Sequence, residues 1–447
     1  MNITTLYQIF KKCAGGVTTD TRHCPQGSLF VALRGEHFDG NDYAAQALRM
    51  GSSYVLVDNP ACVPHEGDDR YIVVDNTLNS LQQLANYHRR QLNTPLIAIT
   101  GTNGKTTTKE LMAAVLSQSQ CILYTEGNLN NHIGVPLTLL RLRQEHVLGI
   151  IEMGASHPGD IRQLVTIAEP NYGIITNVGK AHLEGFGSFE GVLRTKAELY
   201  DYLRNASQST VFIHHDNPYL LSLSNRLNKI YYGSDDNLYV NGRVTGNSPF
   251  LTFEWKAGKN GEYHEVTTRL IGAYNFPNAL AAVTAGRYFG IKEEKINAAL
   301  RNYTPQNNRS QLVTTPSNTL IVDAYNANPT SMLAALSNFR DMDMPHKMLI
   351  LGDMRELGKE SADEHRRILA FVNECGFDNV VLVGTSFAAA AADTASASAG
   401  TAAAVTYRLY PDTPALIADL RKHKPQGKTI LIKGSNSTGL STVTEEL

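Results

Sequence analysis

Residues 100–107 carry the most specific chemical signal in the sequence, TGTNGKTT, between an apolar run (LIAIT) and an amphipathic run (KELMAAVLSQS). This order predicts a strand, a loop and a helix, which is the setting of a phosphate-binding loop. Glycines let backbone N–H groups converge on phosphate oxygens, Lys105 adds positive charge, and the Thr106 hydroxyl can ligate Mg²⁺. Because Ile99 stands where a longer loop would have its glycine, the spacing is G-x-x-G-K-T instead of G-x-x-x-x-G-K-[ST]. We predict a nucleotide site here, and a loop that only caps a helix is the alternative.

Two further residues follow predicted strands. Glu152 ends the apolar run VLGIIE, so its carboxylate lies at a strand tip, where it could hold the magnesium of a nucleotide directly or through water. His182 follows a strand in TNVGKAHLEGFG. An exposed strand-end acid and a capping or structural histidine are the alternatives for these two positions.

Lys196 lies in GVLRTKAELYDYL, where Val192, Lys196, Leu199 and Leu203 share one face of a predicted helix. That face should be buried. A buried lysine must find a partner, lose its charge or be modified, and the alternative is that its long side chain reaches the surface.

The composition of the 447-residue chain is that of a globular protein with two or three domains. Its 40 Lys+Arg and 42 Asp+Glu give a formal charge of -2, which does not favour nucleic-acid binding. The apolar runs are far shorter than the roughly 20 residues that span a bilayer, and the N-terminus does not resemble a secretory signal. We therefore expect a cytoplasmic protein without membrane insertion, whose five scattered cysteines are reduced.

Short Val/Ile/Leu runs alternate with longer helix-period runs, which predicts an α/β fold with parallel strands. A first unit holds the predicted strands SLFVAL and SYVLV. A second block opens at Leu96 and includes strands at 121–125, 147–152, 172–177 and 210–214, then a looser β-like stretch at 231–270. A third block repeats the alternation after YTPQNNRS. We assign no function to its Ala-rich residues 386–405.

The order of the motifs resembles the Mur ligases, ATP-dependent enzymes that form amide bonds in peptidoglycan precursor synthesis. The resemblance runs nearly end to end, through DTR (20–22), LFVALRGEHFDG (29–40), TGTNGKTTTKE, GNLNNHIGVPLTLL (127–140), EMGASHPGDI, ITNVGKAHLEGFGS, TKAEL, YNFPNALAA (274–282), DAYNANPTSM (323–332) and LGDMRELG (351–358). Four of these, FVALRGEHFDG, GNLNNHIGVP, DAYNANP and GDMRELG, are similar to the branch of the family that adds D-alanyl-D-alanine to UDP-N-acetylmuramoyl-tripeptide.

The resemblance implies three domains: a small N-terminal α/β domain that binds the UDP end of the substrate (1–90), a central parallel-sheet ATPase domain (91–309) and a C-terminal Rossmann-like domain (310–447). It also implies a reaction. ATP phosphorylates the terminal carboxylate of the tripeptide, and the amine of D-alanyl-D-alanine attacks the acyl phosphate and displaces phosphate.

The resemblance further implies roles for single residues. Two Mg²⁺ ions are implied, the first held by Thr106 and Glu152 and the second by His182 and a carbamylated Lys196. The implied catalytic residues are Lys105, Lys196, His182 and Arg309, of which Arg309 reaches the γ-phosphate on domain closure. ATP contacts are implied for Gly101, Thr102, Asn103, Gly104, Lys105, Thr106, Thr107, for Asn275 and Asn278 in the adenine pocket, and for Asp323 near the ribose. Substrate contacts are implied for Asp20, Thr21, Arg22, Asn128, Asn131, and for Asn326 and Asn328 on the side of the nucleophile.

The last predicted strand departs from the family pattern. The related ligases usually end it with K-G-S-R, whereas this chain has Asn436 after KGS, which leaves the C-terminal contribution to substrate binding open. Ligases that add a single amino acid and folylpolyglutamate synthases are alternatives within the family. The segment LFVALRGEHFDG disfavours a folate enzyme, which lacks a separate UDP-binding domain. A nucleotide-dependent switch protein is a more distant alternative, disfavoured by the loop spacing and by the missing N-K-x-D signature.

Overall fold

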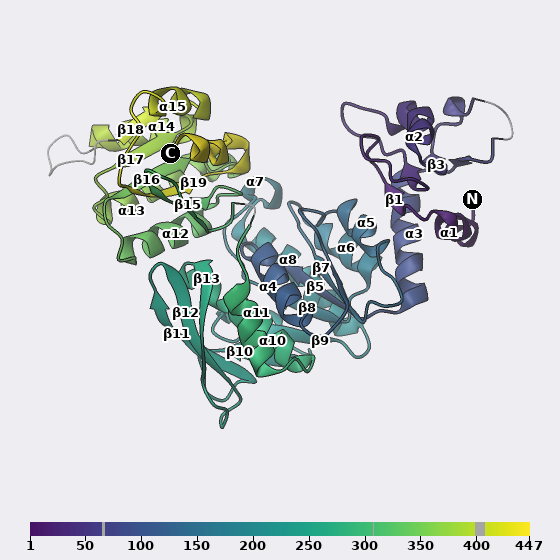
Figure 1. Cartoon of the computed structure of the whole chain (residues 1–447), viewed down its shortest axis with the longest axis horizontal. Helices are drawn as coiled ribbons and strands as arrows, with labels where there is room; N and C mark the ends of the chain where they lie inside the picture. The colour runs from purple at the N-terminus through teal and green to yellow at the C-terminus, as the bar shows by residue number, and fades with distance from the viewer. Residues whose placement is uncertain (65–67, 307, 398–406) are drawn as a thin grey trace.

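The chain folds into three lobes, each built on one β-sheet (Figure 1). The computed structural model describes residues 1–64, 68–306, 308–397 and 407–447. In Figure 1 the N-terminal lobe is purple, the central lobe runs from blue to green, and the C-terminal lobe runs from green to yellow. The mixed α/β architecture predicted from the alternating pattern is confirmed.

The N-terminal lobe contains a four-stranded parallel sheet in the order β1-β2-β3-β4. Its elements are α1 (Ile3–Lys12), β1 (Val17–Thr18), β2 (Leu29–Val31), η1 (Gly40–Tyr43), α2 (Ala44–Met50), β3 (Tyr54–Val57), η2 (Pro60–Cys62), β4 (Tyr71–Val73) and α3 (Thr77–Leu92). Helix α3 leads into the central lobe, where the buried Arg89 donates from Nε to the carbonyl of Ala168 at 2.6 Å. Helix α3 therefore connects the N-terminal lobe to the central lobe.

The central lobe contains a nine-stranded sheet in the order β13-β12-β11-β10-β9-β8-β5-β7-β6. Neighbouring strands from β6 to β11 in this order are parallel, and β11, β12 and β13 are antiparallel. The strands are β5 (Leu96–Thr100), β6 (Ile122–Tyr124), β7 (Leu148–Glu152), β8 (Tyr172–Ile175), β9 (Thr210–His214), β10 (Lys229–Gly233), β11 (Val240–Asn247), β12 (Phe250–Ala257) and β13 (His264–Ile271). The helices are α4 (Lys105–Leu116), α5 (Gly134–Leu139), α6 (Asp160–Ala168), α7 (Leu183–Phe186), α8 (Phe189–Asn205), α9 (Pro218–Leu223), η3 (Ala273–Asn275), α10 (Phe276–Tyr288) and α11 (Glu293–Asn302).

Strand β5 is apolar up to its last residue, Thr100. Every residue of β5 is buried, because helices cover both faces of the sheet. Successive side chains point to opposite faces, so Leu96 and Ala98 join the core beside α6 and α8, while Ile97 and Ile99 join the core beside α4 and α10. The strand is thereby fixed at the centre of the lobe, with the loop at residues 101–104 at its carboxyl end.

The C-terminal lobe contains a six-stranded sheet in the order β14-β15-β19-β16-β17-β18, parallel except for β14. Its elements are β14 (Gln311–Thr314), β15 (Thr319–Asp323), α12 (Pro329–Asp341), β16 (Lys347–Gly352), η4 (Gly358–Glu360), α13 (Ser361–Glu374), β17 (Val380–Val383), α14 (Thr385–Ala397), β18 (Tyr407–Tyr410), α15 (Thr413–Leu420), β19 (Thr429–Lys433), η5 (Asn436–Thr438) and η6 (Leu440–Glu446). Helix α14 holds the first part of the Ala-rich segment, and the rest of that segment lies outside the described residues.

Polar contacts join the central and C-terminal lobes along the segment after β8. Lys180 Nζ lies 2.6 Å from Glu364 Oε1 and 3.1 Å from Glu360 Oε2, and the backbone N–H of Glu184 donates to the carbonyl of Glu356 at 3.2 Å. The carboxyl ends of strands from both lobes therefore meet. Among the helices of the described chain, none is both long and apolar enough to cross a membrane.

Candidate active site

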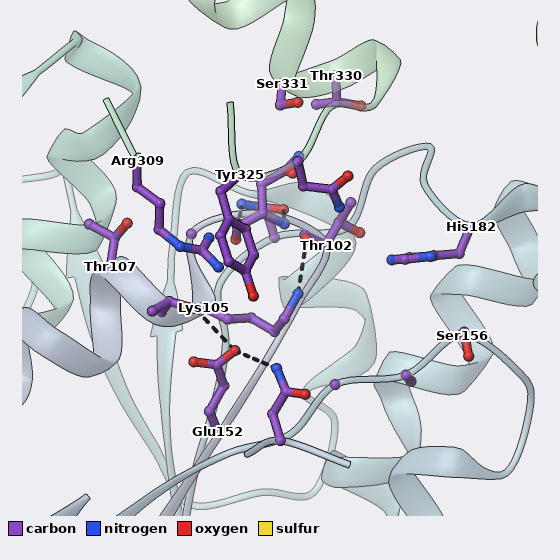
Figure 2. Close-up of a pocket in the computed structure, with 18 of the residues that line it drawn as sticks. Thr102, Lys105, Thr107, Glu152, Ser156, His182, Arg309, Tyr325, Thr330 and Ser331 are labelled. Carbon is purple, nitrogen blue, oxygen red and sulfur yellow. Dashed lines mark hydrogen bonds between the residues drawn. The ribbon is translucent and has the colours of Figure 1, made fainter. Parts of the chain in front are cut away.

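A cavity of about 780 Å³ lies where the strand ends of the central and C-terminal lobes meet. Adjacent strands β8, β5 and β7 contribute Asn177, the loop at residues 102–104 and Glu152 to its wall, and β15 and β19 contribute Asp323 and Lys433. Figure 2 shows Arg309 and Tyr325 beside each other above Lys105 and Glu152, with His182 and Ser156 on the other side of the cavity. Ligands of parallel α/β sheets bind at such strand ends.

The phosphate loop depends on its two glycines. Gly101 and Gly104 have φ angles of 142° and 78°, a region that side chains rarely adopt. A Cβ on Gly101 would lie 2.0 Å from Thr176 Oγ1, and one on Gly104 would lie 2.6 Å from Asn278 Oδ1. No side chain of the described residues caps the N-terminus of α4, so its backbone donors can serve a bound anion. The glycine angles and the start of α4 are compatible with the phosphate site that the sequence predicts, which stays a prediction.

Lys105 folds back over this loop. Its Nζ donates to the carbonyls of Gly101 and Thr102 at 2.7 and 3.0 Å. Burial lowers the pKa of Lys105 to about 8, the charge of Glu152 opposes this shift, and the nearby Arg309 adds to it. The ammonium group is therefore held at the loop beside a second cation, which favours a polyanion.

Glu152 is buried at the end of β7, and its two carboxylate oxygens have different surroundings. Oε1 accepts the hydroxyl of Thr106 at 3.1 Å and the amide of Asn130 at 2.9 Å. Oε2 is also buried but has no hydrogen-bond partner among the described residues. A buried carboxylate oxygen without a donor is costly, which makes it a good ligand for a cation.

The chemistry of these donors fits Mg²⁺. In the described part of the chain, no group of three or more His, Cys, Asp or Glu side chains is placed to hold a metal ion. A cation at Glu152 would therefore take further oxygen ligands, such as the Thr106 hydroxyl, phosphate or water, which is the usual coordination of Mg²⁺. Because the Thr106 hydroxyl donates its proton to Glu152, its lone pairs are free for a cation.

Arg309 stacks on Tyr325. The centre of its guanidinium lies 3.7 Å from the ring centroid, and its buried Nε has no hydrogen-bond partner within the residues that the structure describes. Stacking leaves the planar N–H edge of an arginine available, and this edge suits a phosphate oxygen. Figure 2 shows the guanidinium directed toward the space above Lys105.

Asn275 and Asn278, at the start of α10, connect to α4 through side-chain hydrogen bonds. Thr108 Oγ1 donates to Asn278 Oδ1 at 3.2 Å, and Asn278 Nδ2 donates to Asn275 Oδ1 at 3.0 Å. Asn275 also borders a second cavity of about 450 Å³, which shares Thr106, Thr107 and Arg309 with the first. Apolar and aromatic walls of this second cavity, including Tyr124, Leu270 and Tyr303, suit a planar base.

Asp323 forms an ion pair with Lys433, a residue for which the sequence predicted no role. The fully buried Lys433 donates from Nζ to Asp323 Oδ2 at 2.5 Å and to the carbonyl of Asn326 at 3.3 Å. Asp323, Asn326 and Lys433 all line the cavity. Asn436, where the chain departs from the family pattern, is exposed and does not line the cavity.

His182 and Lys196 both lie near enough to Lys105 for its charge to act on them. His182 lines the cavity, and its Nδ1 contacts the carboxylate of Glu356 from the C-terminal lobe. Burial lowers the pKa of His182, with Glu356 opposing the shift. Lys196 is 2% exposed on the same face of α8 as Val192 and Leu199, so its predicted burial is confirmed.

The surroundings of Lys196 disfavour a charged amine. Burial, and then the charge of Lys105, hold the pKa of Lys196 well below its usual range. Its Nζ lies 5.6 Å from the ring centroid of Phe186. Lys196 is not among the residues that line the cavity, although His182 beside it is.

The predicted substrate residues are not all brought together. Asn131 lines the cavity, and its Oδ1 accepts the backbone N–H groups of Ile133 and Gly134 at the start of α5. Asn128 is exposed and lies outside the cavity wall, and the buried Asn328 does not line the cavity either. The remaining predicted residues, Asp20, Thr21 and Arg22, lie in the N-terminal lobe, where Arg22 forms an exposed ion pair with Asp20 at 2.7 Å.

Three protein families match the chain in order. They are the Mur ligase family, catalytic domain (residues 14–89), the Mur ligase middle domain (99–286) and the Mur ligase, glutamate ligase domain (308–436).

Similar proteins include two enzymes named UDP-N-acetylmuramoyl-tripeptide–D-alanyl-D-alanine ligase. The Bacillus subtilis enzyme is 37% identical over 83% of this chain and 80% of its own length. The Escherichia coli enzyme is 36% identical over 96% of this chain and 93% of its own length. A crystal structure of MurF from Acinetobacter baumannii superposes with a TM-score of 0.83 at 31% identity and covers 96% of this chain and 92% of that chain.

Proposed function

This chain belongs to the Mur ligase family, and from that premise we propose that it joins D-alanyl-D-alanine to UDP-N-acetylmuramoyl-tripeptide at the expense of ATP. The products are the UDP-muramoyl-pentapeptide, ADP and phosphate, and the reaction belongs to peptidoglycan precursor synthesis. The observation that carries this proposal is the single cavity in which Lys105, Glu152 and Arg309 of the phosphate site meet Asp323 and Asn326 of the C-terminal lobe. Such a cavity can hold a triphosphate, a carboxylate and an amine together.

The first step joins two anions, so it requires concentrated positive charge. The backbone donors at the start of α4 and the Lys105 ammonium would hold the phosphates, and Arg309 would lie along the γ-phosphate. The tripeptide carboxylate attacks the γ-phosphorus, the bond to the β-phosphate oxygen breaks, and ADP leaves. Mg²⁺ held by Thr106 and Glu152 would neutralise charge on the phosphate oxygens.

In the second step the amine of D-alanyl-D-alanine attacks the carbonyl carbon of the acyl phosphate. The amine loses a proton, and the tetrahedral intermediate expels phosphate to leave the amide. Asn326 and its neighbours on the C-terminal lobe would position the amine, since the strand ends of that lobe face the phosphate loop. A second Mg²⁺ at His182 and a carbamylated Lys196 would hold the carboxylate in place.

We also propose a division of the reaction among the lobes. Residues 1–90 would bind the UDP end of the substrate through Asp20, Thr21 and Arg22, residues 91–309 would bind ATP, and residues 310–447 would bind the amine. Helix α3 spans the first of these boundaries and ends at Leu92. The placement of Asp20 and Arg22 in a different lobe from the cavity is consistent with an extended substrate whose two ends are held separately.

Phosphate release by the purified protein tests the proposal. We expect ATP turnover only when UDP-N-acetylmuramoyl-tripeptide and D-alanyl-D-alanine are both present, since acceptor and amine are separate substrates. Turnover that depends on D-glutamate or a free diamino acid would indicate a ligase for a single amino acid. Turnover with a folate would indicate a folylpolyglutamate synthase, and hydrolysis without any amine would favour a switch protein.

A further inference from the structure

Asn130 lies at the cavity, between the end of β6 and the start of α5. Its side-chain Nδ2 donates to Glu152 Oε1 at 2.9 Å, and its backbone carbonyl accepts the N–H of Gly154 at 2.7 Å. A further backbone bond, from Asn130 N–H to the carbonyl of Asn128 at 2.7 Å, closes a tight turn. The side chain of Asn130 is therefore held against Glu152 by the fold of its own backbone.

Both hydrogen bonds that the described residues donate to the Glu152 carboxylate go to one oxygen, Oε1. Thr106 and Asn130 approach Oε1 from two different elements, α4 and the turn after β6. Two donors on a single oxygen fix the plane of the carboxylate, because rotation would break both bonds. Oε2 is then the atom left without a donor in the described structure.

Gly154, two residues after the end of β7, supports the same arrangement. A Cβ on Gly154 would lie 2.9 Å from Asn130 Oδ1 and 3.1 Å from Asn130 Cγ. Contacts this short would push the amide of Asn130 away from its place. Glycine at this position therefore leaves the room that Asn130 needs to reach Glu152.

We infer that Asn130 is a positioning residue: it fixes the carboxylate of Glu152 so that Oε2 is presented to a divalent cation at the phosphate loop. The inference rests on the proposed function, because that function supplies the cation. Asn130 contacts neither substrate nor metal in this arrangement and acts through Glu152 alone. Loss of an outer hydrogen bond to a metal ligand typically lowers metal affinity about 10- to 100-fold.

Binding of Mn²⁺ to the full-length protein in the presence of ADP, followed by electron paramagnetic resonance, tests the inference. Asn130→Ala should weaken Mn²⁺ binding by about tenfold or more, while ADP binding in EDTA stays within about twofold of the parent protein. Asn205→Ala is the matched control, since Asn205 is an exposed asparagine at the end of α8 whose side chain donates to the carbonyl of Asp201. It should change neither quantity.

A second variant separates positioning from general damage. Gly154→Ala keeps the amide but displaces it, so it should weaken Mn²⁺ binding as Asn130→Ala does. In the Asn130→Ala background the same change should add little, because the clash partner is gone. Normal Mn²⁺ affinity in a folded Asn130→Ala or Gly154→Ala protein would overturn the inference. It would also be overturned if either variant lost Mn²⁺ binding and metal-free ADP binding to the same extent. Failure of the parent protein to turn over the proposed substrates would instead count against the proposed function.

Discussion

The side-chain amides of Asn103 and Asn328 are hydrogen-bonded to each other across the boundary between the phosphate loop and the C-terminal lobe. Asn328 Nδ2 donates to Asn103 Oδ1 at 2.8 Å, and Asn103 Nδ2 lies 3.4 Å from Asn328 Oδ1. Asn328 Oδ1 also accepts the backbone N–H of Ser331 and thereby caps α12. One side chain thus connects the position of α12 to the conformation of the phosphate loop.

Asn328→Ser should keep the cap on α12 and remove the hydrogen bond to Asn103. Serine caps helices about as well as asparagine but is too short to hold Asn103, so we expect a stability within about 0.5 kcal/mol of the parent. Turnover should fall about tenfold, because the C-terminal lobe no longer fixes the loop. Asn328→Ala loses the cap as well and should cost about 1 kcal/mol in addition. Thermal unfolding and phosphate release measure the two effects.

The partner variant Asn103→Ala provides the check on this coupling. If the two amides work as a pair, the double variant Asn103→Ala/Asn328→Ser should be no slower than the slower single variant. Fully additive losses in turnover would show that each asparagine acts on its own.

Lys105→Ala should abolish turnover and leave the fold intact. Among the described residues, the Lys105 ammonium bonds to two carbonyls of its own loop, so its removal takes away charge and little packing. We expect kcat/KM to fall by about 100-fold or more, with unfolding temperature near that of the parent. Near-normal phosphate release from the folded variant would mean that the loop is not the ATP site.

The parts of the fold that the sequence predicted are those with a strong local pattern. Strand β5 and helix α4 were predicted because a buried strand is mostly apolar and because the run after the loop has a helical period. The burial of Lys196 followed from helical spacing in the same way. These features depend on residues a few positions apart, which is why they can be found without a structure.

The contacts missed by sequence reasoning join residues that are far apart in the chain. Asn130 and Glu152 are 22 residues apart, and Lys433 and Asp323 are 110 apart, so no periodic pattern relates them. In the run NLNN, the prediction selected Asn128 and Asn131, but the turn after β6 directs Asn130 toward Glu152. The backbone conformation of the turn decides which asparagine of the run faces the site. The sequence alone does not give that conformation.

The attachment of the N-terminal lobe should weaken in mild acid because of His88. Nε2 of this buried histidine lies 2.9 Å from the carbonyl of Leu142, which can only accept, so Nε2 carries the proton and Nδ1 accepts from the Tyr7 hydroxyl at 3.2 Å. Burial lowers the pKa of His88 below its usual 6.5. Above about pH 6.5 the ring is neutral in both folded and unfolded protein, whereas below it the unfolded chain binds a proton that the folded one resists. The free energy that holds α1 and α3 in place should therefore fall as the pH drops below 6.5.

Amide hydrogen exchange in α1, corrected for the intrinsic rate at each pH, would measure this effect. Exchange should accelerate between pH 6.5 and pH 5 in the parent protein. His88→Gln should exchange faster than the parent at pH 7.5, since hydrogen bonds are lost, but should show a flatter dependence on pH. An equal pH dependence in the two proteins would contradict the role of His88.

Lys196 should carry a carbamate in the active protein. Its side chain is 2% exposed, faces the same core as Val192 and Leu199, and has the aromatic ring of Phe186 as its neighbour, so an ammonium ion there would be poorly solvated. Attack of the neutral amine on CO₂, with loss of a proton, would turn this group into an anionic oxygen ligand beside His182. The resemblance of the TKAEL segment to the Mur ligases implies the same modification, which gives an argument independent of burial.

Lys196→Ala should accordingly lose most activity, about 100-fold or more, because a metal ligand is removed. Small carboxylates such as formate or acetate should partly restore turnover by occupying the vacated position, and they should have no such effect on Lys105→Ala, where a cation is missing. Carbon-13 NMR of the parent protein in labelled bicarbonate should show a carbamate signal that is absent from Lys196→Ala. A free amine at Lys196 in the protein bound to Mg²⁺ and nucleotide, with no carbamate signal, would show that burial of this lysine serves packing alone.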